Sequence, residues 1–298
     1  MIDQSSHDSI PDELDKSIAF GVNELGKFEF GDMYHAAATL LLKPDVEFCF
    51  VGTDSEQDAY FEFIQSFGPT NLTRVSVQQY KKDKDKYFRA GMSADVIEKF
   101  SLNDDTKKRF LDVSSFDECD DNLREFIESR VRKCDCPVVL IWIRDQEYRE
   151  DRNSTFESIK RLKNRLQAAG YKTVLIGSEL DEFRSETGNF LNFHQEEPFR
   201  SSVRCQLRMF WLLQAHYNVV ASVGMMSGGM DGPAFFSNLP AIFFCKQEDD
   251  GRMSKVCQTF TNMKIIYYEL IAEKTEFENH QDSEIEQLIE YLGNTHTM

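Results

Sequence analysis

The sequence predicts an α/β fold with two parallel sheets, each covered by helices on both faces. Two features of the pattern carry this prediction. Short apolar runs alternate along the chain with segments of helical periodicity, which is the rhythm of successive βαβ units. In addition, the run 137–144 is almost continuously apolar and rich in β-branched residues, as in a strand that is buried on both faces of a parallel sheet.

In the first half of the chain, the alternation predicts three strands and three helices. The strands are expected at 17–22, 46–52 and 74–79, and the helices at 34–42, 57–67 and 121–132. A polar stretch at 81–120, rich in Lys and Asp, interrupts the alternation, so we expect loops or an insertion there.

The second half is more regular. Strands are expected at 137–144, 173–177, 219–223, 241–245 and 264–268, and helices at 155–169, at 203–216, shortly after Asp231 and at 283–291. Gly170 supplies a typical stop for the helix over 155–169. We place the domain boundary near Cys134, which gives two Rossmann-like domains of ordinary size, 1–134 and 135–298.

Composition and charge restrict the function. The 298 residues, 41% of them hydrophobic, are enough for two cores, and no apolar run approaches the roughly 20 residues that cross a bilayer. The formal charge of −17 argues against nucleic acid or an anionic membrane surface as a partner. Residues 1–16 are polar and acidic, unlike a secretory leader, and the seven cysteines are scattered, with only Cys134 and Cys136 close together. We therefore expect a cytoplasmic protein with reduced thiols.

The stretch 219–244 is the most specific motif. A strand is followed by a turn that contains Gly224, Gly228 and Gly229, after which Asp231 is expected to cap a helix with Pro233 in its first turn. Backbone N–H groups of 227–231 and the helix dipole would then form an anion site at the carboxyl edge of a parallel sheet. The alternative is that the glycines only form a tight turn.

A second candidate lies at 30–35. Asp32 is expected at a helix N-terminus after the first strand, where a carboxylate could act as a general base or simply cap the helix. His35, one turn further on, is either a ligand contact or an ordinary half-buried histidine.

A third candidate is the arginine-rich segment after the strand at 137–144. Arg144 is expected at the end of this strand, with Arg149 and Arg152 in the following loop, and guanidinium groups match a diphosphate well. Alternatively, the acidic residues of the same loop pair with these arginines in solvent. The acidic residues are Asp145, Glu147, Glu150 and Asp151.

Several familiar signals are missing. Glycines at 21, 26 and 31 do not form the GxGxxG pattern of a nicotinamide dehydrogenase. The six histidines are far apart, and neither HExxH nor CxxC occurs, so the sequence predicts no metal site.

These motifs together resemble the two-domain (GT-B) glycosyltransferases, particularly inverting heptosyltransferases and fucosyltransferases. The segment Gly31-Asp32-Met33-Tyr34-His35 matches the Gly-Asp-x-x-His element of heptosyltransferases, in which the aspartate is the proposed base. The spacing from Ser227 to Pro240 is similar to that of their donor turn, although Ser227 replaces the family's aspartate and Gly232 its histidine. Arg144 resembles the diphosphate-binding arginine of fucosyltransferases.

The resemblance implies a metal-independent, inverting transfer of a sugar from a nucleotide-sugar donor to an acceptor hydroxyl, without a cofactor, in a cleft between the domains. Asp32 and Arg144 would be catalytic, and the other candidates would bind the donor. The donor-binding set is Gly31, His35, Arg149, Arg152, Gly177, Glu179, Ser227, Gly228, Gly229 and Asp231. Alternatives are an epimerase or pyruvyltransferase on the same scaffold, and a non-catalytic binding protein of degenerate transferase fold.

Overall fold

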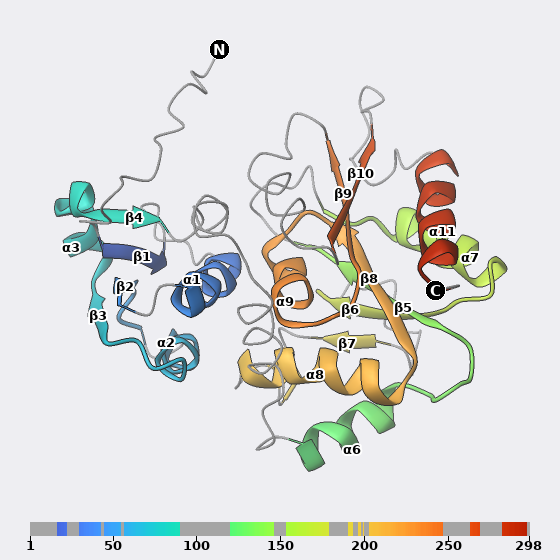
Figure 1. Ribbon diagram of the computed structural model, residues 1–298, viewed down its shortest axis with the longest axis horizontal. Helices are drawn as coiled ribbons and strands as arrows, with labels where there is room; N and C mark the ends of the chain where they lie inside the picture. The colour runs from blue at the N-terminus through green and yellow to red at the C-terminus, as the bar shows by residue number, and fades with distance from the viewer. Residues whose placement is uncertain are drawn as a thin grey trace. The chain divides into compact units, whose positions relative to one another are not determined.

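The computed structural model describes residues 17–22, 30–42, 45–54, 57–89, 120–145, 153–178, 190–192, 196–197, 199, 203–246, 263–268 and 282–296. The chain divides into two compact units, Met1–Lys107 (unit 1) and Lys108–Met298 (unit 2). Each unit contains one parallel sheet with helices packed on it (Figure 1). The predicted α/β class with two parallel sheets is confirmed.

Unit 1 contains a four-stranded sheet in the order β3-β2-β1-β4. The strands all run parallel and are β1 (Ser17–Gly21), β2 (Glu47–Val51), β3 (Asn71–Val75) and β4 (Tyr87–Arg89). The helices are α1 (Phe30–Leu42), α2 (Asp58–Gln65) and α3 (Val77–Lys82), followed by the 3-10 turn η2 (Lys84–Lys86). Since β2 and β3 lie on one side of β1 and β4 on the other, the direction of winding reverses between β1 and β4.

The part of unit 1 after β2 and α2 differs most from the sequence-based expectation. The strand expected at 74–79 ends at Val75, because Ser76 is the N-cap of α3 and its side chain accepts the N–H of Gln79 at 3.1 Å. The polar stretch from 81 onwards, expected to form loops or an insertion, begins with the end of α3, η2 and the short strand β4.

Unit 2 contains a six-stranded parallel sheet in the order β10-β9-β8-β5-β6-β7. The strands are β5 (Val138–Ile143), β6 (Lys172–Gly177), β7 (Phe190–Asn192), β8 (Val219–Met225), β9 (Ala241–Lys246) and β10 (Met263–Tyr268). The helices are α6 (Asp120–Arg130), α7 (Phe156–Ala168), α8 (Val203–His216), α9 (Gly228–Phe236) and α11 (Asp282–His296). The three-residue edge strand β7 was not predicted.

Helices cover both faces of the second sheet (Figure 1). On one face, Val139, Ile141 and Ile143 of β5 belong to a buried cluster with apolar residues of α7 and α11. On the other face, Trp142 lies near Phe210 of α8, with their ring centroids 6.3 Å apart, and also meets the start of α9. Alternate residues of β5 therefore pack against one helical layer, and the residues between them pack against the other.

Helix α6 belongs to unit 2. Phe126 packs edge-on against Phe199 with a centroid distance of 5.2 Å, and Arg130 Nη2 lies 2.6 Å from Glu196 Oε1. The division between the units therefore falls earlier in the chain than the boundary predicted near Cys134, because α6 buries its apolar face against the second sheet's helical layer. Its amphipathic sequence indicates a helix but not its packing partner.

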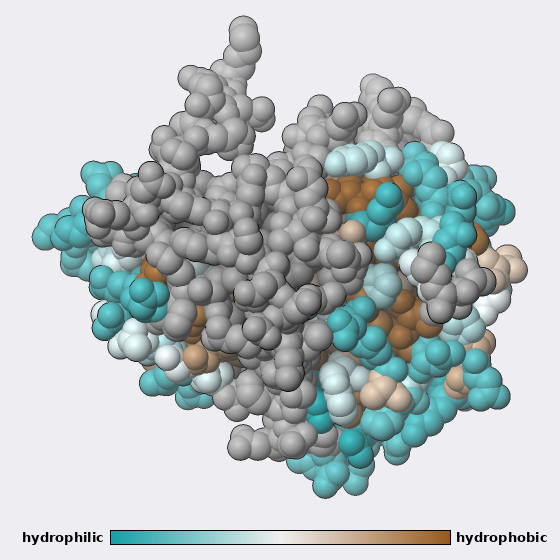
Figure 2. Space-filling view, in the orientation of Figure 1, coloured by the Kyte–Doolittle hydropathy of each residue, from teal (hydrophilic) through white to brown (hydrophobic). Residues whose placement is uncertain are grey.

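Hydrophilic residues make up most of the coloured surface in Figure 2, with apolar residues showing in patches among them. None of the described helices combines the length and apolar composition that a membrane span needs.

Candidate functional site

The strand order of unit 2 identifies the place where an open α/β sheet binds ligands. From β5 the chain winds outward through β6 to β7, then returns to the other side of β5 and winds outward from β8 to β10. The direction of winding therefore reverses between β5 and β8, and ligands of such sheets bind beyond the carboxyl ends of the strands at this point. Arg144 follows β5 directly, and Ser227 follows β8 after one residue.

The start of α9 presents the positive end of a helix at this edge. Ser227 is the N-cap residue, with extended φ and ψ of −153° and 158°, yet its side chain makes no capping hydrogen bond. Gly228 and Gly229 are the first two helical residues, and both are partly exposed, as is Ser227. Backbone N–H groups in the first turn of a helix lack intrahelical partners and favour anions, so this end of α9 suits a phosphate group.

The predicted role of Asp231 as the N-cap is wrong. Gly228 and Gly229 are helical instead of forming an extended turn, and the N-cap is Ser227, so the helix begins four residues earlier than expected. Asp231 consequently lies inside the first turn and is only 4% exposed, and Pro233 lies further inside the helix. Asp231 remains next to the predicted anion site, but it is not the residue that begins the helix.

The structure gives three of the glycines a packing role that sequence reasoning missed. A Cβ on Gly229 would lie 2.5 Å from Cζ3 of Trp142, one on Gly224 would lie 2.7 Å from its Cβ, and one on Gly177 would lie 2.9 Å from its Cε3. These glycines, from α9, β8 and β6, make room for a single tryptophan side chain, and this residue is 5% exposed. The signal in the sequence was a tryptophan near the end of a strand, with glycines at the ends of the neighbouring strands.

Hydrogen bonds hold Arg144 at the end of β5. Its backbone N–H donates to Ser154 Oγ at 3.0 Å, and its carbonyl accepts the N–H of Ser154 at 2.7 Å. Its guanidinium Nη1 donates to Oδ1 of Asn153. The segment before α7 therefore fixes both the backbone and the side chain of this half-buried arginine.

Gly177 and Ser178 lie beside Arg144, because β5 and β6 pair in register up to Ile143 and Gly177. The N–H of Ser178 donates to the carbonyl of Ile143 at 3.0 Å. Gly177 and the start of α9 therefore lie against Trp142, and Arg144 follows two residues after this tryptophan, at the same edge of the sheet. Three other predicted residues, Arg149, Arg152 and Glu179, lie outside the described residues, and so does the side chain of Asp32.

In unit 1, α1 begins at Phe30 and places Gly31 and Asp32 in its first turn, after β1 and hence beside the reversal between β1 and β4. His35 is fully buried, and this favours an ordinary core histidine over a ligand contact. Within the described part of the chain, no group of three or more His, Cys, Asp and Glu residues could hold a metal ion.

Comparisons with known proteins leave the family open. No protein-family model and no curated protein matches the chain. Among solved structures, the chain is similar to that of E. coli ADP-heptose LPS heptosyltransferase II, with 10% sequence identity and a TM-score of 0.47 over 94% of this chain and 98% of the other. A likeness at this level supports no inference about family or activity.

Proposed function

We propose that this protein is a glycosyltransferase that binds a nucleotide-sugar donor on unit 2 and transfers the sugar to an acceptor hydroxyl. The observation that carries the proposal is the pair of features flanking the reversal between β5 and β8. A cationic side chain, Arg144, follows one strand, and a helix N-terminus follows the other. Because the chain carries a formal charge of −17, a diphosphate has to be bound by a local group of cationic side chains and N–H donors. Arg144 and the start of α9 supply such a group.

In this proposal, Arg144 and the N–H groups of Gly228 and Gly229 bind the donor's diphosphate. They stabilise the negative charge that grows on the nucleoside diphosphate as it leaves, so the reaction needs no metal ion. Gly177 and Ser178, one strand further along, flank the nucleoside. Asn153 is a positioning residue, since it accepts a hydrogen bond from the guanidinium of Arg144.

The proposed chemical step is a direct displacement. The acceptor oxygen attacks the anomeric carbon while the bond from that carbon to the diphosphate oxygen breaks, and the electron pair leaves with the nucleoside diphosphate. Attack from the opposite side inverts the anomeric configuration. Asp32 is proposed to take the acceptor proton, on the strength of its sequence position in the first turn of α1.

The experiment begins with a panel of nucleoside diphosphates and nucleotide sugars at millimolar concentration, measured by thermal shift. A ligand that binds the folded state raises the melting temperature. We expect a shift for at least one nucleotide and the release of nucleoside diphosphate when an acceptor is added. Arg144→Ala should abolish both signals. Arg165→Ala is the matched control, because Arg165 lies 43% exposed on α7, paired with Glu286.

Two outcomes would separate the alternatives. If no nucleotide or nucleotide sugar shifts the melting temperature, the proposal is wrong. If a nucleotide binds without release of nucleoside diphosphate, and Asp32→Asn leaves this binding unchanged, the protein is a non-catalytic binding protein. That outcome would agree with a purely structural role for the glycines around Trp142, which are Gly177, Gly224 and Gly229. Mass spectrometry of the products would recognise an epimerase or a pyruvyltransferase, since neither transfers the sugar to an acceptor.

A further inference from the structure

Two thiols lie in contact in the loop between α6 and β5. Cys134 Sγ and Cys136 Sγ are 2.7 Å apart, and Cys134 Sγ is 3.5 Å from the carbonyl oxygen of Cys136. Both cysteines are free and partly exposed. The other described cysteines are buried; they are Cys49, Cys205 and Cys245. The pair is therefore distinguished from these three thiols by both proximity and access.

The backbone around this pair is fixed by neighbouring elements. The carbonyl of Asp135 accepts a hydrogen bond from Asn218 Nδ2 at 3.3 Å, and the carbonyl of Pro137 accepts the N–H of Lys172 at 2.9 Å. Asn218 also accepts the N–H of Val138 through its carbonyl at 2.9 Å. These bonds tie the loop to the turn before β8 and to the start of β6. The two sulfurs are consequently held together before any bond forms between them.

We propose that Cys134 and Cys136 form a reversible thiol–disulfide site, closed by exchange with a small-molecule disulfide such as oxidised glutathione. One thiolate of the pair attacks the external disulfide, forms a mixed disulfide and releases one glutathione thiolate. The second thiolate then attacks the protein sulfur of that mixed disulfide and releases the second glutathione. Two cysteine thiols are oxidised, one glutathione disulfide is reduced to two thiols, and the cysteine protons pass to the released glutathione.

Geometry favours closure of this bond. A disulfide has a sulfur–sulfur distance of about 2.05 Å, so the two sulfurs need to approach by less than about 1 Å. Because the ring would span only three residues, closure restricts the unfolded chain much less than a long-range disulfide does. An accessible disulfide of this kind is readily reduced, as a reversible site requires.

The environment of Cys134 also sets the rate of the thiol–disulfide exchange. Burial raises the pKa of the Cys134 thiol above its ordinary value, and the sulfur of Cys136 adds to this rise, whereas the Lys172 ammonium opposes it. The thiolate is the reactive form, so exchange is expected to be slow near neutral pH and to need incubations of hours.

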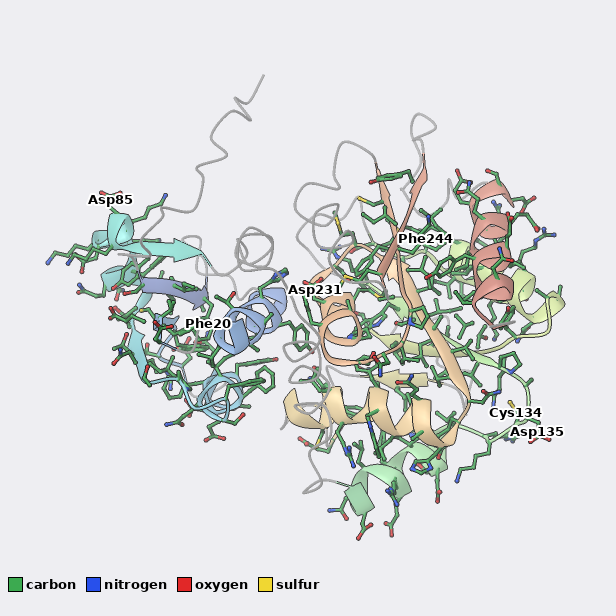
Figure 3. All side chains as sticks on the ribbon, in the orientation of Figure 1. Phe20, Asp85, Cys134, Asp135, Asp231 and Phe244 are labelled. Atoms are coloured by element: carbon green, nitrogen blue, oxygen red, sulfur yellow. The ribbon has the colours of Figure 1, made fainter. Side chains whose placement is uncertain are left out.

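The site lies away from the proposed donor site. Cys136 lies two residues before the start of β5 and Arg144 directly follows its end, so the six-residue strand alone separates them by roughly 20 Å. Figure 3 shows Cys134 near the outer end of the loop, far from Asp231 on α9. The proposal does not depend on the proposed function.

The test uses the reduced full chain, incubated with excess oxidised glutathione, quenched with N-ethylmaleimide and analysed by peptide mass spectrometry. Cys119→Ser and Cys257→Ser together supply a background without the two remaining thiols. We expect the peptide with Cys134 and Cys136 to lose two hydrogens and resist alkylation, and reduced glutathione to restore it. In Cys136→Ser, Cys134 should instead retain glutathione as a mixed disulfide. Cys205→Ser, which removes a buried thiol, should close the ring as the wild type does.

Two results would overturn the proposal. One is full alkylation of Cys134 and Cys136 after incubation with oxidised glutathione. The other is glutathione retained on both residues without ring closure. Since the wild-type measurement alone decides between these results and a closed ring, a folding defect in Cys136→Ser would not obscure the answer. Circular dichroism of each variant checks its fold.

Discussion

Gly229→Ala tests whether the glycines at the carboxyl edge of the second sheet exist to accommodate Trp142. The new methyl group would lie 2.5 Å from Cζ3 and 3.0 Å from Cε3 and Cη2 of the indole. Carbon atoms in contact are normally about 3.5–4.0 Å apart, so the ring or the helix has to move. Gly177 lies against Cε3 and Cζ3 of the same ring, and Gly224 lies against the Cβ of the same side chain, so the indole has little room to move away.

The expected loss of stability follows from two opposing effects. Overpacking of a closed core costs about 1–3 kcal/mol, whereas replacing a helical glycine by alanine stabilises a helix by about 0.5–1 kcal/mol. We therefore expect Gly229→Ala to lower the free energy of unfolding by about 1–2 kcal/mol. Gly293→Ala in α11 is the matched control, because a Cβ there has no atom within 4 Å, and it should raise the free energy by about 0.5–1 kcal/mol.

Urea denaturation followed by tryptophan fluorescence is the assay. Both tryptophans of the chain, Trp142 and Trp211, belong to unit 2, so the signal reports on the unit that carries the substitution. Trp142→Phe should reduce the cost of Gly229→Ala, because the smaller ring leaves room for the methyl group. The reasoning is refuted if Gly229→Ala is as stable as the wild type, or if it shifts the midpoint in the same direction as Gly293→Ala.

Three further substitutions test other contacts. Arg74→Ala should destabilise unit 1 by roughly 2 kcal/mol, because the guanidinium donates to the Gly52 carbonyl and to Asp58 Oδ1, each at 2.6 Å. Hydrogen exchange of the backbone amides at 52–54 and 57–58 should accelerate in Arg74→Ala. Lys86→Ala, which removes the lysine of an exposed ion pair, should leave this exchange unchanged. Ser227→Asp should cap α9 and preserve or raise the melting temperature, yet its charge should remove the shift caused by a nucleoside diphosphate; an undiminished shift would contradict the proposed anion site. Burial raises the pKa of Tyr217 to about 12, above its ordinary value of about 10, so the neutral phenol stabilises the fold below pH 10 and this contribution is lost as the pH rises through 12. Tyr217→Phe should therefore flatten the fall of the urea midpoint between pH 10 and 12, and an unchanged slope would contradict the shift.

Elements whose signals lie in consecutive residues were predicted well. β5 appears as a continuous apolar run and is buried at every position. Helix α7 begins at a capping box of Thr155 and Ser158, and Gly170 follows its C-terminal end with a φ of 91°. Each signal is local, because a hydrogen bond to the first turn or a positive φ depends on the identity of one or two neighbouring residues.

Elements that depend on distant partners were not predicted. β4 and β7 have only three residues each and exist by pairing with β1 and β6, so their own sequence contains almost no pattern. The start of α9 was misplaced because the same glycines suit a turn and a helix N-terminus. Their helical conformation accompanies close packing against Trp142, which is far away in the sequence.

The candidate site shows the same contrast between local signals and distant contacts. By itself, the sequence determined that Arg144, Gly177 and Ser227 follow or end strands, because strand periodicity and the residues that stop it are local properties. Only the tertiary structure decided that these strands are neighbours, that the winding reverses between β5 and β8, and that one indole fills the space between the glycines. The physical reason is that strand order and core packing arise from contacts between segments that are remote in the chain, which no single segment specifies.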